Sequence, residues 1–102
     1  MTRAVAYVPD LMDRSRMSGA AADITFVAAP DQLADASAGA DLVIVDLTRP
    51  GALGAVGALG GHKVIGFANH TERELMEAAR TAGCQTVLAR SAFFSRLGEL
   101  LA

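Results

Sequence analysis

Five short apolar runs are spaced evenly along the chain, and polar residues interrupt the sequence between them. Runs of this length that are rich in Val, Ile, Leu and Ala are typical of strands buried on both faces of a parallel sheet. Between the runs, apolar residues recur with helical spacing. The predicted strands are 4–8, 24–28, 42–46, 63–68 and 85–89, and the predicted helical segments are 10–17, 30–38, 51–61, 71–82 and 92–101.

Strict alternation of strands and helices predicts parallel strands joined by right-handed crossovers in a three-layer α/β/α sandwich. In the first helical segment, 10–17, the spacing predicts that Leu11 and Met12 face the core and that Asp13 faces water. The segment 51–61 carries glycine at every third position, which predicts a ragged or 3₁₀-like helix of low stability. We interpret these glycines as sites where a thin helix packs closely on the sheet.

Composition narrows the class of protein. The chain has 102 residues, of which 52% are hydrophobic, which suits a single folded domain spanning 1–102. A net charge of −2 without a basic cluster argues against a nucleic-acid partner. No apolar run reaches the ~18 residues of a membrane span, and no signal peptide is visible. Cys84 is the only cysteine, so we expect a cytoplasmic protein, and the Arg-rich, Lys-poor, Ala-rich composition suggests a bacterial source.

The strand 42–46 carries the most informative side chain, because it ends in Asp46 and is followed by Pro50 and Gly51. Open α/β sheets bind their ligands at the carboxyl ends of their strands. We expect Asp10, His70 and Arg90 to lie at this same edge, since each follows a predicted strand. A lone His at such a position is most often solvated, and an Asp there often caps a helix.

The pattern of a hydrophobic run, Asp46 and then Pro50-Gly51 resembles the phosphoacceptor strand of bacterial response-regulator receiver domains. The likeness in element order covers nearly the whole chain. It implies the flavodoxin-like strand order 2-1-3-4-5. It also implies that Asp46 is the phosphoacceptor and that Asp10, Asp46 and the main-chain carbonyl of Thr48 hold Mg²⁺, if the domain is competent for phosphorylation.

Several positions depart from the receiver pattern. Pro9 stands where receivers carry the first of two acids, and Ala68 stands where they carry a Ser or Thr hydroxyl. Arg90 replaces the lysine at the end of strand five, and Val87 replaces the aromatic residue of the switch. Fewer carboxylates weaken a site for a hard cation. Arg90 is a candidate phosphate contact, but pairing with Asp46 or Asp10 is the favoured alternative. These departures predict an atypical, or pseudo-, receiver.

Three functions remain open. The favoured one is a regulatory protein-interaction module in signal transduction, which is not an enzyme and is not phosphorylated. The alternative is a stand-alone response regulator of a two-component system, with a phosphoryl group on Asp46. A small-ligand or enzymatic domain ranks third, because no triad or cofactor motif is visible and neither His62 nor Cys84 has a suitable neighbour. The expected contact, with a partner or in a homodimer, is formed by helix four, strand five and helix five, whose charged residues are Glu72, Arg73, Glu77, Arg80, Arg96 and Glu99.

Overall fold

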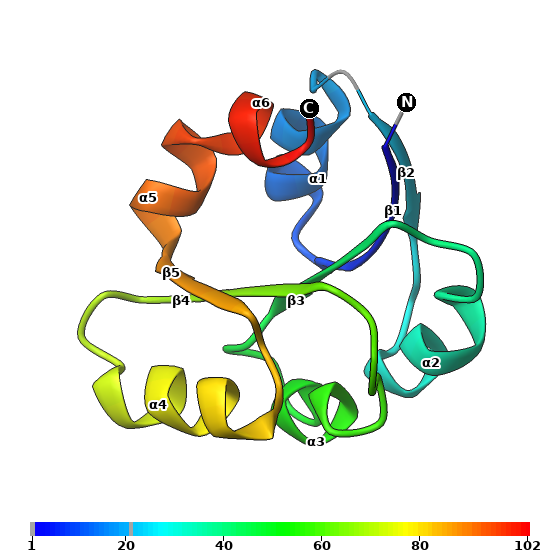
Figure 1. Ribbon diagram of the computed structural model, residues 1–102. Helices are drawn as coiled ribbons and strands as arrows, with labels where there is room; N and C mark the ends of the chain where they lie inside the picture. Colours follow the sequence, from blue (N-terminus) through cyan, green and yellow to red (C-terminus); the bar gives the residue numbers. More distant parts are fainter. Residues whose placement is uncertain (1, 21) are drawn as a thin grey trace.

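The computed structural model describes residues 2–20 and 22–102, and within them the chain forms one parallel sheet in the order β2-β1-β3-β4-β5 (Figure 1). This order confirms the predicted fold class. The strands are β1 (Arg3–Tyr7), β2 (Asp23–Phe26), β3 (Leu42–Asp46), β4 (Val64–Ala68) and β5 (Thr86–Ala89). The helices are α1 (Leu11–Ser18), the 3₁₀ helix η1 (Pro30–Gln32), α2 (Leu33–Ala36), α3 (Ala52–Val56), α4 (Arg73–Ala82), α5 (Arg90–Ser95) and α6 (Leu97–Leu100).

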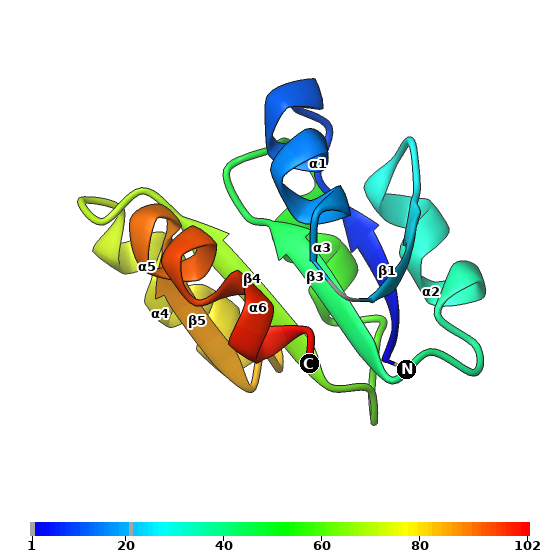
Figure 2. The same ribbon diagram turned by 90° about the horizontal axis from the view of Figure 1, so that it is seen from above.

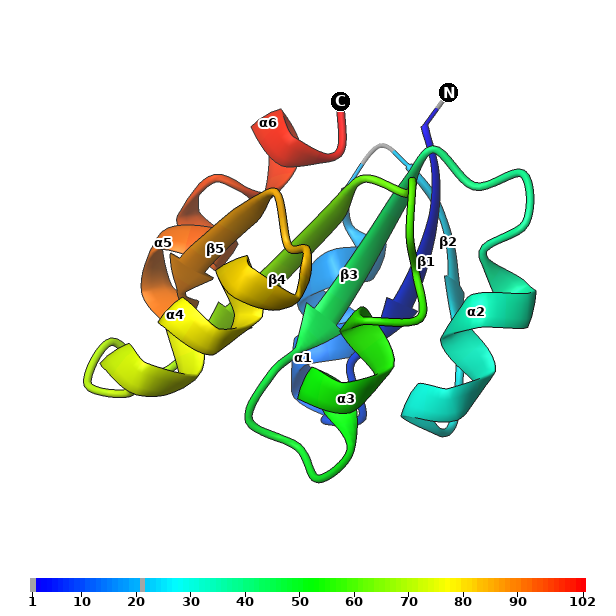
Figure 3. The same cartoon turned by 60° about the horizontal axis from the view of Figure 1, so that its bottom comes forward.

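Helices cover both faces of the sheet, which is why the central strands read as continuous apolar runs. Every residue of β3 and β4 is buried. One face packs against α2, α3 and α4 around Leu33, Val45 and Val56, as Figure 3 shows with these helices in front of the sheet. The other face packs against α1, α5 and α6 around Phe67 and Phe93, whose rings stack with centroids 4.7 Å apart (Figure 2). None of the helices in the two described ranges is long and apolar enough to cross a membrane.

The prediction for the inward face of α1 is wrong. Leu11 and Met12 are 76% and 79% exposed, whereas Asp13 is buried. The carboxylate of Asp10 accepts hydrogen bonds from the main-chain N–H groups of Met12 and Asp13, at 2.9 and 3.0 Å, and so sets where the helix begins. That start rotates Asp13 toward the sheet edge and leaves the first apolar pair in water. Met17, one turn after Asp13, is the apolar side chain of α1 that enters the core.

The glycine-rich segment does not pack on the sheet in the way predicted. Only residues 52–56 form a helix there, and a Cβ added at Gly54 or Gly60 would meet no atom within 4 Å. Gly51 does have a structural reason, because its φ of +81° is costly for other residues. Close approach to the sheet therefore does not explain Gly54, which costs α3 about 1 kcal/mol relative to alanine.

The last predicted helix is broken into two. α5 ends at Ser95 and α6 begins at Leu97, with Arg96 between them outside helical geometry. The change of direction brings the end of the chain beside its start, where the hydroxyl of Thr2 donates to the main-chain oxygen of Ala102 at 2.9 Å. Figure 1 shows both ends near β1, on the side where the strands begin.

Candidate functional site

Asp46 lies at the carboxyl end of β3 and is only 1% exposed. Its Oδ1 accepts hydrogen bonds from the main-chain N–H of Thr48 at 3.1 Å and from the Thr48 hydroxyl at 2.6 Å. Its Oδ2 lies 3.3 Å from Nε of Arg49, which donates to it in an ion pair. Both carboxylate oxygens are therefore engaged by residues that lie two and three positions later in the sequence.

The turn that carries Thr48 and Arg49 is held by Leu47. The main-chain N–H of Leu47 continues the sheet by donating to the carbonyl of Phe67 at 2.9 Å. The Leu47 side chain lies directly on Gly66 of β4, where an added Cβ would be 2.7 Å from Leu47 Cδ1. Because real Cβ atoms do not approach so closely, glycine at position 66 is needed to seat Leu47. The side chain that follows Asp46 is thus seated against a glycine in the neighbouring strand.

Asp10 serves as the N-cap of α1. The main-chain N–H groups of Asp13 and Met12, together with the positive charges of Arg49 and Arg90, hold the pKa of the Asp10 carboxyl below its usual value, against a smaller opposing effect of burial. Its capping role, one of the two alternatives for this residue, is therefore present in the structure. The Asp10 carboxylate lies at the same edge as Asp46, because the charges of Arg49 and Arg90 act on both carboxylates.

Arg90 pairs with Asp13, not with Asp46 or Asp10, so the predicted ion-pair partners are wrong. Arg90 Nη2 donates to Asp13 Oδ1, and the guanidinium also lies 5.2 Å from the Phe94 ring centroid and 5.7 Å from that of Phe67. The hydrogen bond to Asp13 raises the pKa of Arg90, and the charges of Asp46 and Asp10 add to it. Asp13 was missed because helical spacing alone placed it in water.

Two separate acid–arginine pairs therefore occupy this edge, Asp46 with Arg49 and Asp13 with Arg90. The first could have been anticipated, since Asp46 and Arg49 are three residues apart at a strand end. The second joins α1 to α5 across 77 positions of sequence and leaves no local signal. Ala68, where receivers carry a hydroxyl, is completely buried.

The other candidates do not join this cluster in the part of the chain that the structure describes. His70 is exposed in the loop after β4. His62 precedes β4, at the opposite edge, where its Nε2 lies 3.4 Å from the Ser37 hydroxyl oxygen. Cys84 is buried as expected, and burial raises the pKa of its thiol to about 11. Such a thiol is protonated at neutral pH and is a weak nucleophile.

The donor set fits Mg²⁺ poorly in this arrangement. Among residues 2–20 and 22–102, no group of three or more His, Cys, Asp or Glu side chains is placed to hold a metal ion. Divalent cations of this kind bind oxygen ligands and favour carboxylates. Here Asp46 is already neutralised by Arg49, and Asp10 caps a helix. The third expected ligand is the main-chain carbonyl of Thr48. The hydroxyl of the same residue is bound to Asp46.

The predicted interaction face, formed by α4, β5 and α5, extends onto α6, where Glu99 lies, and its charges are partly satisfied by pairs within the face. Arg80 pairs with Glu77 at 2.7 Å, and Arg96 pairs with Glu99 at 3.0 Å. Both pairs join residues three positions apart and are exposed, so each contributes little to stability. These four side chains lie on the surface as predicted, but their charges already have partners.

Comparisons with known proteins show the same fold. No family model matches the sequence, and no curated protein sequence matches it. A response regulator from Hahella chejuensis superposes with a TM-score of 0.82 at 15% identity, over 99% of this chain and 92% of the other. The chemotaxis protein CheY4 of Vibrio cholerae gives 0.77 at 15% identity, over 99% and 96%.

A putative pilus assembly protein (CpaE) from Burkholderia thailandensis gives a TM-score of 0.73 at 18% identity, over 99% of this chain and 95% of the other. Together, these structures establish that the chain has the flavodoxin-like fold of response-regulator receiver domains. At identities of this size the likeness concerns the fold.

Proposed function

We propose that this chain is a regulatory protein-interaction domain of signal transduction, a pseudo-receiver that works without phosphorylation of Asp46. The observation that carries the proposal is the double engagement of the Asp46 carboxylate by Thr48 and Arg49. A phosphoacceptor oxygen must be free to attack a phosphoryl donor. Here the positive charge that pairs with the Asp46 carboxylate comes from Arg49 of the same chain.

The remaining side chains of the edge support the same function. Arg90, which stands at the position of the receiver lysine, is held by Asp13 and by two aromatic rings. Ala68 offers no hydroxyl that could follow a phosphoryl group. A signal would then pass through surface contacts alone, without a covalent step at this edge. The domain would act as a binding partner and not as an enzyme.

Exposure to a small-molecule phosphoryl donor tests this proposal directly. The wild-type protein, incubated with acetyl phosphate and Mg²⁺, is expected to show no acyl phosphate by intact-mass spectrometry. The variant Arg49→Ala, combined with Ala68→Thr, frees the carboxylate and restores the hydroxyl, and Asp46→Asn is the matched control. An acyl phosphate on the wild type that disappears in Asp46→Asn would overturn the proposal and establish a phosphorylatable response regulator.

The partner surface that we propose for this function is the face formed by α4, β5 and α5. Its exposed charges of both signs suit a homodimer or a partner with a mixed surface. The variant Arg73→Glu alters this face at an exposed position outside the two internal ion pairs. A wild-type protein that sediments as a monomer at high micromolar concentration would count against the homodimer.

A further inference from the structure

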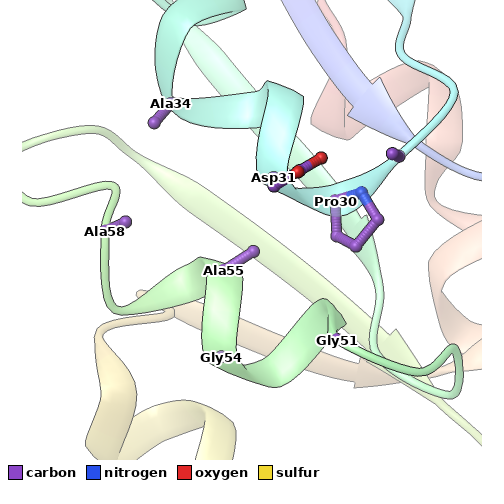
Figure 4. Close-up of a pocket in the computed structure, with 8 residues that line it drawn as sticks. Pro30, Asp31, Ala34, Gly51, Gly54, Ala55 and Ala58 are labelled. Carbon is purple, nitrogen blue, oxygen red and sulfur yellow. The ribbon is translucent and has the colours of Figure 1, made fainter.

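An apolar groove runs between η1–α2 and α3 (Figure 4). These helices cover the face of the sheet opposite α1 (Figure 1). The volume of the groove is about 600 Å³, and its walls are made of small side chains, with Asp31 at η1. Figure 4 shows Ala34 and Asp31 on one side and Ala55 and Ala58 on the other. The floor between them has no long side chain that fills it.

Gly54 lines this groove, and the fold of the chain itself gives no reason for a glycine there. Its φ is not in the left-handed region, and a Cβ would meet nothing within 4 Å. Glycine in a helix allows another backbone or side chain to approach closely. Gly54 is exposed and lines the groove, so its backbone is accessible to a second molecule there.

A matching pair of side chains is exposed on the other face. Leu11 and Met12 are the large hydrophobic residues that are exposed in the described parts of the chain, and both lie in the first turn of α1. Arg16 follows Met12 by one helical turn and forms no ion pair with a described residue. Its guanidinium carbon lies 4.1 Å from the Phe94 ring centroid.

The groove carries an acid that can pair with Arg16. Asp31 lines the groove, and Asp35 lies in the adjoining hollow next to β2; no basic residue lines either hollow. At the start of α1, Arg16 is exposed, whereas Arg14 is half-buried and donates to the carbonyl oxygens of Val8 and Val27. Of the two acids there, Asp10 caps the helix, and Asp13 is buried and paired with Arg90. A second copy of this chain therefore offers both the apolar side chains and the charge that the groove lacks.

We propose that the groove receives the first turn of α1 from a second copy of this chain, with Leu11 and Met12 against Gly54 and Ala55 and with Arg16 toward Asp31. The two surfaces lie on opposite faces of the sheet, so the contact is heterologous. A contact of this kind cannot close by twofold symmetry, and it yields chains or rings. It is distinct from the face formed by α4, β5 and α5, and it stands whether or not Asp46 is phosphorylated.

Sedimentation velocity over a range of protein concentrations tests the proposal, with two variants that each block one of the two contacting surfaces. The wild type is expected to exceed the mass of a dimer as concentration rises, and to dissociate as salt is added, since the charged groups are exposed. Met12→Glu removes the α1 surface and keeps the groove, whereas Gly54→Gln fills the groove and keeps α1. In an Arg73→Glu background, which alters the face formed by α4, β5 and α5, each variant alone is expected to be monomeric. An equimolar mixture of the two is expected to form a 1:1 dimer that does not grow further.

Both substitutions are at exposed positions, and glutamine favours a helix more than glycine does, so neither is expected to unfold the domain. Lys63→Gln, at an exposed position before β4 that belongs to neither surface, is the matched control for the change of one charge unit and is expected to associate like the wild type. A wild type that stays monomeric at millimolar concentration would overturn the proposal. So would variants that associate as the wild type does, or an association that stops at a dimer.

Discussion

The pair of Asp13 and Arg90 allows a quantitative prediction about what ties α1 to α5. Asp13 has 4% of its side chain exposed and Arg90 has 38%, so the pair is neither fully buried nor a surface pair. Exposed pairs contribute ~0–1 kcal/mol, whereas removing one partner of a fully buried pair costs ~3–5 kcal/mol. Hydrogen bonds to charged groups fall between, at ~1.5–3 kcal/mol. We therefore expect a coupling free energy of about 2 kcal/mol.

A double-mutant cycle of Asp13→Asn, Arg90→Met and the double variant measures this coupling. Each single change is expected to lower the free energy of unfolding by about 2 kcal/mol, because it leaves a charge without its partner. The double variant is expected to lose about the same amount and not twice as much. With a urea dependence of ~1 kcal/mol per M for a chain of this size, each loss moves the midpoint by roughly 2 M.

The cycle for Glu77 and Arg80 provides the control. These residues also form an Arg–carboxylate hydrogen bond, but their side chains are 73% and 47% exposed. Their coupling is expected to stay below ~1 kcal/mol. If the losses for Asp13 and Arg90 add within ~0.5 kcal/mol, the two residues do not act as a pair, and the reasoning from burial is refuted.

Three further outcomes are expected. Gly66→Ala places a Cβ 2.7 Å from Leu47 Cδ1 and should destabilise the domain by ~1–3 kcal/mol in urea unfolding, a loss that a change at the open position Gly54 should not produce. Burial raises the pKa of the Cys84 thiol to about 11 in the folded chain, so above about pH 9 the unfolded chain loses this proton first. The free energy of unfolding should therefore fall with rising pH more steeply in the wild type than in Cys84→Ala. Because the pKa of Asp10 is lowered in the folded chain, its carboxylate stabilises the fold at neutral pH, and this contribution is lost as pH falls below about 3.8. The difference in melting temperature between the wild type and Asp10→Asn should therefore shrink in acid. A difference that stays constant with pH would contradict this.

The sequence was sufficient for the fold because the central strands β3 and β4 are runs buried along their whole length, and such runs specify a sheet covered on both sides. It was also sufficient for the place of Asp46, since a carboxylate that ends a buried strand must lie at the sheet edge. The partner of Arg90 could not be predicted in the same way. Helical periodicity gives only the relative directions of side chains, and the capping bonds of Asp10 set the absolute rotation of α1.

The glycine-rich segment shows a different limit. Glycine is compatible with close packing, with a positive φ or with open space, and its sequence pattern does not distinguish among them. In the structure, Gly51 adopts a positive φ and Gly54 borders open space. The surroundings of each glycine depend on the tertiary structure: Gly51 lies near Pro30 of η1, from an earlier part of the chain, whereas Gly54 has no such neighbour.

The hydrogen bond between Thr2 and Ala102 has a consequence for how this domain can be engineered. Because the two ends are in contact where the strands begin, a short linker could join them, and the chain could then be opened in an exposed loop as a circular permutant. For the same reason, the domain could be inserted into a surface loop of a host protein with both junctions at one corner. The Asp46 edge, at the opposite ends of the strands, would still face outward from the host.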